Sequence, residues 1–168
     1  MSVLSRLFLL PGAVALLLAS PLLLAQPDPA ERIGDWIKVC EPIPNSTQKT
    51  CGIIQNVIIQ ETGESVLKAV VREESIGHTV LLSLPLGFAL PPGIEVRVDQ
   101  GAAVRYPVQT CTNHGCLSGW LLDDAKINAM KRGATMTVTL LDLNGTPFEI
   151  PISLTGFTKG FEAIRTAR

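Results

Sequence analysis

Two cysteines and one of the two histidines of this 168-residue chain fall within six positions, in the segment CTNHGC at residues 111–116. Cys111, His114 and Cys116 could serve as zinc ligands, or the two thiols could form a redox pair or a structural disulfide. Zinc sites favour two ligand pairs with short spacing, whereas Cys40 and Cys51 are separated by ten residues. Redox pairs are usually Cys-x-x-Cys at a helix start. The spacing therefore favours a crosslinked turn, with no metal.

The N-terminal residues 1–25 have the layout of a secretory signal peptide. One basic residue, Arg6, precedes a long apolar run that ends in a small residue, Ala25. Pro11 and Pro21 interrupt this run, which favours cleavage over a retained transmembrane anchor. We therefore expect an exported protein, with membrane association only if the signal segment is retained.

The four cysteines all lie beyond this signal, and an exported chain with an even number of cysteines is expected to oxidise them in pairs. Four cysteines allow three pairings. Cys40 ends one strand-like run and Cys51 begins the next, while Cys111 and Cys116 bracket the turn-like TNHG. This local topology favours the pairs Cys40–Cys51 and Cys111–Cys116.

The elements that must position these cysteines are mostly strands. After a polar, flexible lead-in at residues 26–33, short β-branched and apolar segments alternate with turn-forming residues. GIEVRVDQG at 93–101 alternates apolar with charged residues, and CGIIQNVIIQ at 51–60 is typical of a strand buried on both faces. Asn144-Gly145 predicts a hairpin in which both residues take positive φ.

Two short helices are expected besides the strands. DDAKINAMKRG, at 123–133, begins with a capping aspartate and stops at Gly133, and TKGFEAIRT, at 158–166, places Phe161 and Ile164 on one side. Residues 34–168 are therefore predicted to form one all-β domain. We expect a single-domain antiparallel β-sandwich or partly open barrel of about eight to nine strands with two short helices.

The candidate binding residues are two residues of a proline-rich corner and one tryptophan. The corner SLPLGFALPPGIEV, at 83–96, carries Gly87 and Phe88, and Phe88 could either plug the core or join a docking surface. A concave pocket lined by Trp36 or Trp120 would favour a periplasmic small-ligand or glycan binder instead. Gly87, Phe88 and Trp120 are therefore the candidate partner-binding residues.

Catalysis and nucleic-acid binding find little support in the sequence. The net charge is −1, without a basic stripe, which argues against nucleic acid as a partner. No glycine-rich phosphate loop or nucleophile–base motif is present, so we expect no cofactor and no enzymatic activity. An enzyme site would need titratable groups gathered around His78 or His114.

Several segments together resemble one protein family. GDWIKVC, CGIIQ, LPLGFALPPGIEVRVDQG, CTNHGC and SLTGFTKGFEAI, in this order between about Gly34 and Ile164, resemble the invasion-associated locus B proteins of Gram-negative bacteria. The resemblance implies an exported β protein of the cell envelope, in the periplasm, at the outer membrane or secreted from the cell. It also implies that the protein has no established catalytic residues and is related to proteins with a role in host invasion. Its partner would be an envelope or host protein.

Overall fold

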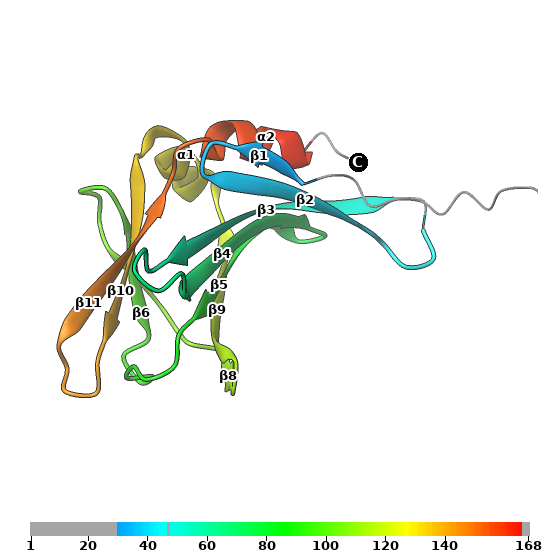
Figure 1. Ribbon diagram of the computed structural model, residues 1–168. Helices are drawn as coiled ribbons and strands as arrows, with labels where there is room; N and C mark the ends of the chain where they lie inside the picture. Colours follow the sequence, from blue (N-terminus) through cyan, green and yellow to red (C-terminus); the bar gives the residue numbers. More distant parts are fainter. Residues whose placement is uncertain (1–29, 47, 166–168) are drawn as a thin grey trace, which may run out of the picture.

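The computed structural model describes residues 30–46 and 48–165, so the expected signal at 1–25 and most of the lead-in lie outside the described residues. The described chain forms two antiparallel sheets and two helices (Figure 1). The seven-stranded sheet has the order β1 (Glu31–Ile33), β2 (Trp36–Pro42), β3 (Lys49–Ile58), β4 (Ser65–Glu74), β5 (Gly77–Leu84), β9 (Gly115–Leu122), β8 (Thr110–Thr112). The four-stranded sheet has the order β11 (Pro147–Ser153), β10 (Thr135–Leu141), β6 (Ile94–Val98), β7 (Val104–Tyr106). The helices are α1 (Asp124–Arg132) and α2 (Phe157–Arg165).

The expected fold class is confirmed, since the two sheets form a sandwich-like arrangement without a closed barrel. The strand number differs from the expected eight to nine, because eleven strands are found in the described residues. The difference lies in β1, β7 and β8, which are three residues long each. Such short strands carry too few residues to show an alternating pattern.

The segment AVRYPVQTC, at residues 103–111, forms two strands because the chain changes sheets within it. AVRYPVQTC contributes β7, which pairs with β6, and β8, which pairs with β9 in the other sheet. Pro107 lies between them and has no N–H to donate to a ladder. Its carbonyl oxygen instead accepts a hydrogen bond from Ser118 Oγ at 2.9 Å, which ties the crossing to β9.

The end of the lead-in is also more ordered than its composition indicates. Glu31–Ile33 forms β1 against β2, and the turn between them packs on the residues directly before α2. Gly34 and Gly156 meet there with φ of 64° and 87°. A Cβ on Gly156 would lie 2.1 Å from the Ile33 carbonyl oxygen, so no larger side chain fits.

The two sheets and α2 are joined by an aromatic core and a polar clamp. Trp36 packs edge-on against Phe157 at 5.7 Å between ring centroids and donates its indole N–H to the Ser153 carbonyl oxygen at 3.0 Å. Gln55, only 7% exposed, donates Nε2–H to that same oxygen and accepts from Ser153 N–H with Oε1, both at 2.9 Å. Ser153 Oγ donates in turn to Asp35 Oδ2 at 2.6 Å. This clamp satisfies buried polar groups where β11 meets the seven-stranded sheet.

Two local expectations were wrong. The β10–β11 hairpin forms, but only Gly145 takes a positive φ, of 82°, and Asn144 does not. The turn is wider than expected because Asp142 Oδ1 accepts hydrogen bonds from the Asn144 and Thr146 N–H groups. Strand β3 is buried on one face rather than both, since Ile54 on its other face is only half-buried.

The two helices form as expected. The side chain of Asp123 caps α1 by accepting from Lys126 N–H at 2.8 Å, and the helix ends at Gly133. In α2, Phe161 and Ile164 are both buried. No helix within residues 30–165 is long and apolar enough to span a membrane.

Candidate functional site

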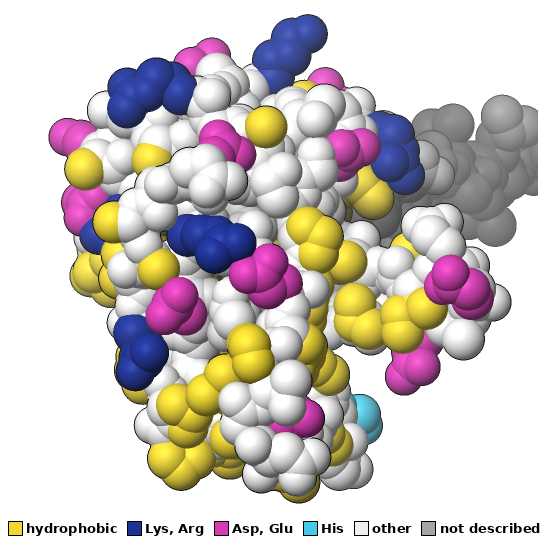
Figure 2. Space-filling view, turned by 90° about the vertical axis from the view of Figure 1, so that its left-hand side faces the viewer, with side chains coloured by type: hydrophobic (Ala, Val, Ile, Leu, Met, Phe, Trp, Pro, Cys, Tyr) yellow, Lys and Arg dark blue, Asp and Glu magenta, His cyan; other side chains and the backbone are white. Residues whose placement is uncertain are grey.

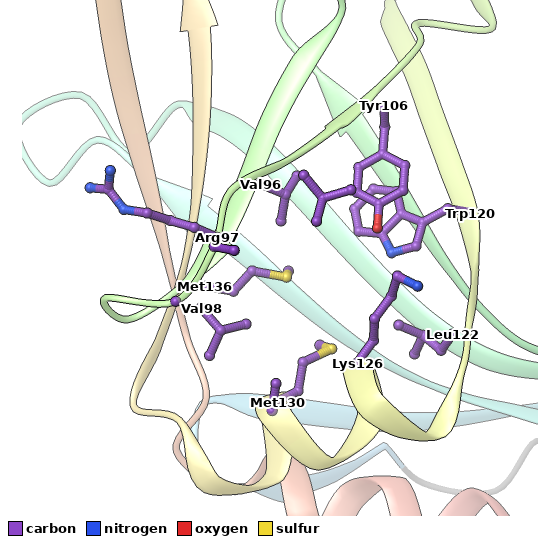
Figure 3. A pocket seen from close by; sticks show the side chains of 13 residues that line it. Val96, Arg97, Val98, Tyr106, Trp120, Leu122, Lys126, Met130 and Met136 are labelled. Carbon is purple, nitrogen blue, oxygen red and sulfur yellow. The ribbon is translucent and has the colours of Figure 1, made fainter.

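An apolar pocket of about 160 Å³ lies between β6 and β10 of the four-stranded sheet, β9 of the seven-stranded sheet and α1 (Figure 3). Its volume is close to the roughly 150 Å³ of an engineered apolar cavity that binds benzene. The pocket therefore fits a molecule of about one ring. The residues that line it are Val96, Arg97, Val98, Gly101, Ala102, Val104, Tyr106, Trp120, Leu122, Lys126, Ala129, Met130 and Met136.

Strand alternation and one helix face position the apolar walls. Val96 and Val98 lie on the same side of β6, and Met136 of β10 is paired directly opposite Val98 in the sheet. Met130 of α1 and Met136 both extend into the pocket in Figure 3. Methionine side chains are flexible and polarizable, so this part of the wall can adapt to a bound molecule.

The remaining wall is a pair of aromatic rings contributed by the two sheets. Tyr106 of β7 stacks on Trp120 of β9 with 4.0 Å between ring centroids and 13° between ring planes. Burial raises the pKa of the Tyr106 hydroxyl, with the nearby Lys126 ammonium opposing the shift, so the hydroxyl is protonated at neutral pH. The pocket thus has a flat aromatic face with polar atoms at its rim.

The charged residues beside the pocket are ion-paired. Lys126 Nζ pairs with the Asp123 carboxylate, whose pKa is lowered chiefly by this hydrogen bond, while the pKa of Lys126 is raised by it. The guanidinium of Arg97 turns away from the pocket, as Figure 3 shows, and its Nη2 lies 3.0 Å from Glu149 Oε1. The pocket and its rim therefore carry almost no net charge.

The three candidate partner-binding residues are not brought together. Trp120 is half-buried and lines the pocket. Phe88 is 4% exposed and belongs to the core. The expectation that Phe88 could join a docking surface is therefore corrected, because its side chain fills the core beneath the proline-rich corner. Gly87 is exposed at a φ of 91°, with open space around it.

Sequence reasoning missed most of the pocket. Tyr106 carried no signal, because its strand has only three residues and its stacking partner lies in the other sheet. Met130 is the buried residue of α1, but in the sequence a packing stripe and a pocket wall have the same periodicity. Lys126 could be placed on α1, whereas its position beside Tyr106 depends on tertiary structure.

The cysteine pairing is confirmed. Disulfides join Cys40 to Cys51 and Cys111 to Cys116, and each pair is directly opposite in an antiparallel ladder. Because both thiols of CTNHGC are in the bridge, the zinc alternative with His114 does not form. Across residues 30–46 and 48–165, no group of three or more histidine, cysteine, aspartate or glutamate side chains is placed to hold a metal ion.

The two histidines lie at opposite ends of the β5–β9 ladder. His78 pairs with Leu122 at one end, and His114 precedes the strand at the other, where Leu84 pairs with Cys116. His78 is half-buried and packs against the Phe161 ring, with 4.6 Å between the ring centroids. His114 is exposed in its turn. The two histidines are therefore not brought together.

These features define a disulfide-bonded, two-sheet β protein with a small apolar pocket between its sheets. The family model for the invasion associated locus B (IalB) protein matches residues 36–165, and the chain belongs to this family. The invasion protein B homologs of Brucella abortus strain 2308 and of biovar 1 strain 9-941 are each 29% identical over 137 residues, covering 80% of this chain and 78% of theirs.

A solved structure has the same fold. The crystal structure of invasion associated protein B from Bartonella henselae matches with a TM-score of 0.73 and 20% identity, covering 81% of this chain and 94% of that one. At this identity the likeness concerns the fold.

Proposed function

We propose that this protein is exported to the cell envelope and acts there by binding rather than by catalysis. The two disulfides support an oxidising compartment, and relatives named invasion protein B homologs support a role at the envelope or towards a host. Residues 1–25 supply the signal for export to the periplasm or beyond. Mass spectrometry of the periplasmic fraction tests this part, with Gln26 as the expected first residue; a reduced chain that starts at Met1 would contradict it.

The main support for a binding role is the apolar pocket that Trp120 lines. Its walls are apolar, it is close to one ring in volume, and its aromatic and methionine side chains are of the kind that line small-molecule sites. A glycan would need several polar partners on its hydroxyl groups, and the walls offer few. The pocket therefore supports a small apolar ligand over a sugar.

A pocket-filling substitution tests this role. Ala129 on α1 lines the pocket, while Ala125 on the same helix is exposed and does not. Toluene should raise the melting temperature of the native protein by mass action, and Ala129→Leu should remove this effect by occupying the space. Ala125→Leu is the matched control and should respond like the native protein.

Two outcomes would count against the pocket. A native protein that gains no stability from toluene would lack a site for it. An equal gain in Ala129→Leu would show that toluene binds elsewhere on the molecule.

The proline-rich corner supports a second candidate, the docking of an envelope or host protein. Leu86 and Leu90 of the loop and Leu143 of the β10–β11 turn are 54%, 45% and 78% exposed. The two segments meet there, with Ala89 N–H donating to the Leu141 carbonyl oxygen at 2.8 Å, and Figure 2 shows hydrophobic side chains gathered at the lower end of this face. Exposed apolar clusters of this kind mark interaction surfaces.

Affinity capture from intact cells distinguishes the corner from the pocket. One specific protein recovered with the native chain and lost with Leu143→Ser, but retained with Ala129→Leu, would support docking at the corner. Equal recovery with native chain and Leu143→Ser would exclude the corner as the contact.

A further inference from the structure

Three hydrogen-bond donors converge at one side of the pocket. Figure 3 shows the Tyr106 hydroxyl, the Trp120 indole nitrogen and Lys126 Nζ directed towards the same region. Within the part of the chain that the structure describes, neither the indole nitrogen nor the Tyr106 hydroxyl is hydrogen-bonded to another protein group. These two donors are therefore available to an acceptor atom of a bound molecule.

The charges around these donors select against an anion. Lys126 is held by Asp123, and the Arg97 guanidinium is directed away, towards Glu149. An anionic group at this point would lie near the Asp123 carboxylate and would have to give up its hydration for a mostly apolar wall. A neutral acceptor, such as a carbonyl oxygen, meets neither cost.

The apolar residues below the donors determine the chemical character of the rest of a bound ligand. Met130, Met136 and Leu122 offer only apolar contacts beneath the donors, in a volume of about 160 Å³. We infer that the pocket binds a neutral, largely apolar molecule of about one ring that places a single acceptor oxygen against Trp120 and Tyr106. This inference depends on the proposed binding role of the same pocket and adds the chemical class of its ligand.

Three probes of similar size separate the possibilities: ethylbenzene has no acceptor, acetophenone has a neutral carbonyl, and benzoate is an anion. Calorimetric titration of the oxidised protein should give a Kd for acetophenone that is lower than the Kd for ethylbenzene by about five-fold for each net hydrogen bond. Benzoate should bind more weakly than either.

The outcomes distinguish the inference from the binding role on which it rests. If neither ethylbenzene nor acetophenone binds, the pocket is not a binding site. If the two bind equally, the pocket binds apolar molecules but the acceptor inference is wrong. Benzoate binding more tightly than acetophenone would overturn the preference for neutral ligands.

Two variants assign the hydrogen bonds. Trp120→Phe keeps an aromatic ring but removes the N–H, and Tyr106→Phe removes the hydroxyl. Each should bring the acetophenone Kd towards the ethylbenzene value while leaving the ethylbenzene Kd within about two-fold. The indole NMR signal of Trp36, which is fully buried, reports whether Trp120→Phe has folded. A folded variant that keeps the preference for acetophenone would exclude that residue as a donor.

Discussion

The clamp between Gln55 and Ser153 provides the sharpest test of how the sheets are joined. Gln55→Met keeps an unbranched side chain of similar length but removes both hydrogen bonds to Ser153, each 2.9 Å long. The Ser153 carbonyl oxygen keeps its bond from Trp36 Nε1, so only the Ser153 N–H loses its partner. One partly buried, unsatisfied N–H costs about 2 kcal/mol, and this is the destabilisation that we expect.

Urea-induced unfolding of the oxidised protein, followed by fluorescence, measures this change as a shift of the midpoint at constant slope. Gln109→Met is the matched control, because Gln109 is exposed and its side chain makes one hydrogen bond, from Nε2 to the Gly119 carbonyl oxygen at 3.1 Å. The control should lose less than about 0.5 kcal/mol. Equal losses in the two variants would refute the clamp, since the same chemical change would then have the same effect at a buried and an exposed position.

Two further predictions concern the crosslinks and the wide hairpin turn. In urea unfolding, replacing the Cys40–Cys51 pair by serines should lower the free energy of unfolding by about 3 kcal/mol, and replacing the Cys111–Cys116 pair by about 2 kcal/mol. The bridges span 11 and 5 residues, and the entropic stabilisation by a disulfide grows with the length of the loop that it closes. A larger loss for the shorter loop would contradict this. The pKa of Asp142 is lowered from its ordinary value of 3.8, chiefly by hydrogen bonds from backbone N–H groups of its turn, so its contribution to stability is present above that value and is lost as the pH falls through the lower, folded-state pKa. The difference in melting temperature between the native protein and Asp142→Asn should therefore become smaller in acid. A difference that grows in acid would show that the folded state raises the pKa of Asp142 instead of lowering it.

Much of the fold could be predicted from the sequence because its signals are local. Alternation in GIEVRVDQG, the Asn-Gly hairpin and Gly133 after an amphipathic run each depend on neighbouring residues and gave correct elements. The cysteine pairs could be assigned for the same reason, since each pair faces across one antiparallel ladder. The local signal fails where a side chain competes with the expected turn, as the Asp142 carboxylate does.

The pocket could not be predicted because its residues meet only through tertiary structure. Tyr106 and Trp120 belong to different sheets, and the chain changes sheets at Pro107, a position that reads as part of one strand. Trp120 was a candidate from its residue type alone. Phe88 could belong to a core or a surface by sequence. In the structure its backbone forms a bridge with Asp142, directly after β10, and its side chain is only 4% exposed.

The chain contains two tryptophans, and their indole N–H signals provide the most direct measurement of the binding role. Trp36 donates to the Ser153 carbonyl oxygen inside the core, whereas Trp120 lines the pocket. In a ¹H–¹⁵N spectrum recorded during titration with toluene, the Trp120 signal should shift to saturation while the Trp36 signal stays in place. A Trp120 signal that does not move, or a shift of the Trp36 signal alone, would contradict a ligand site between the sheets.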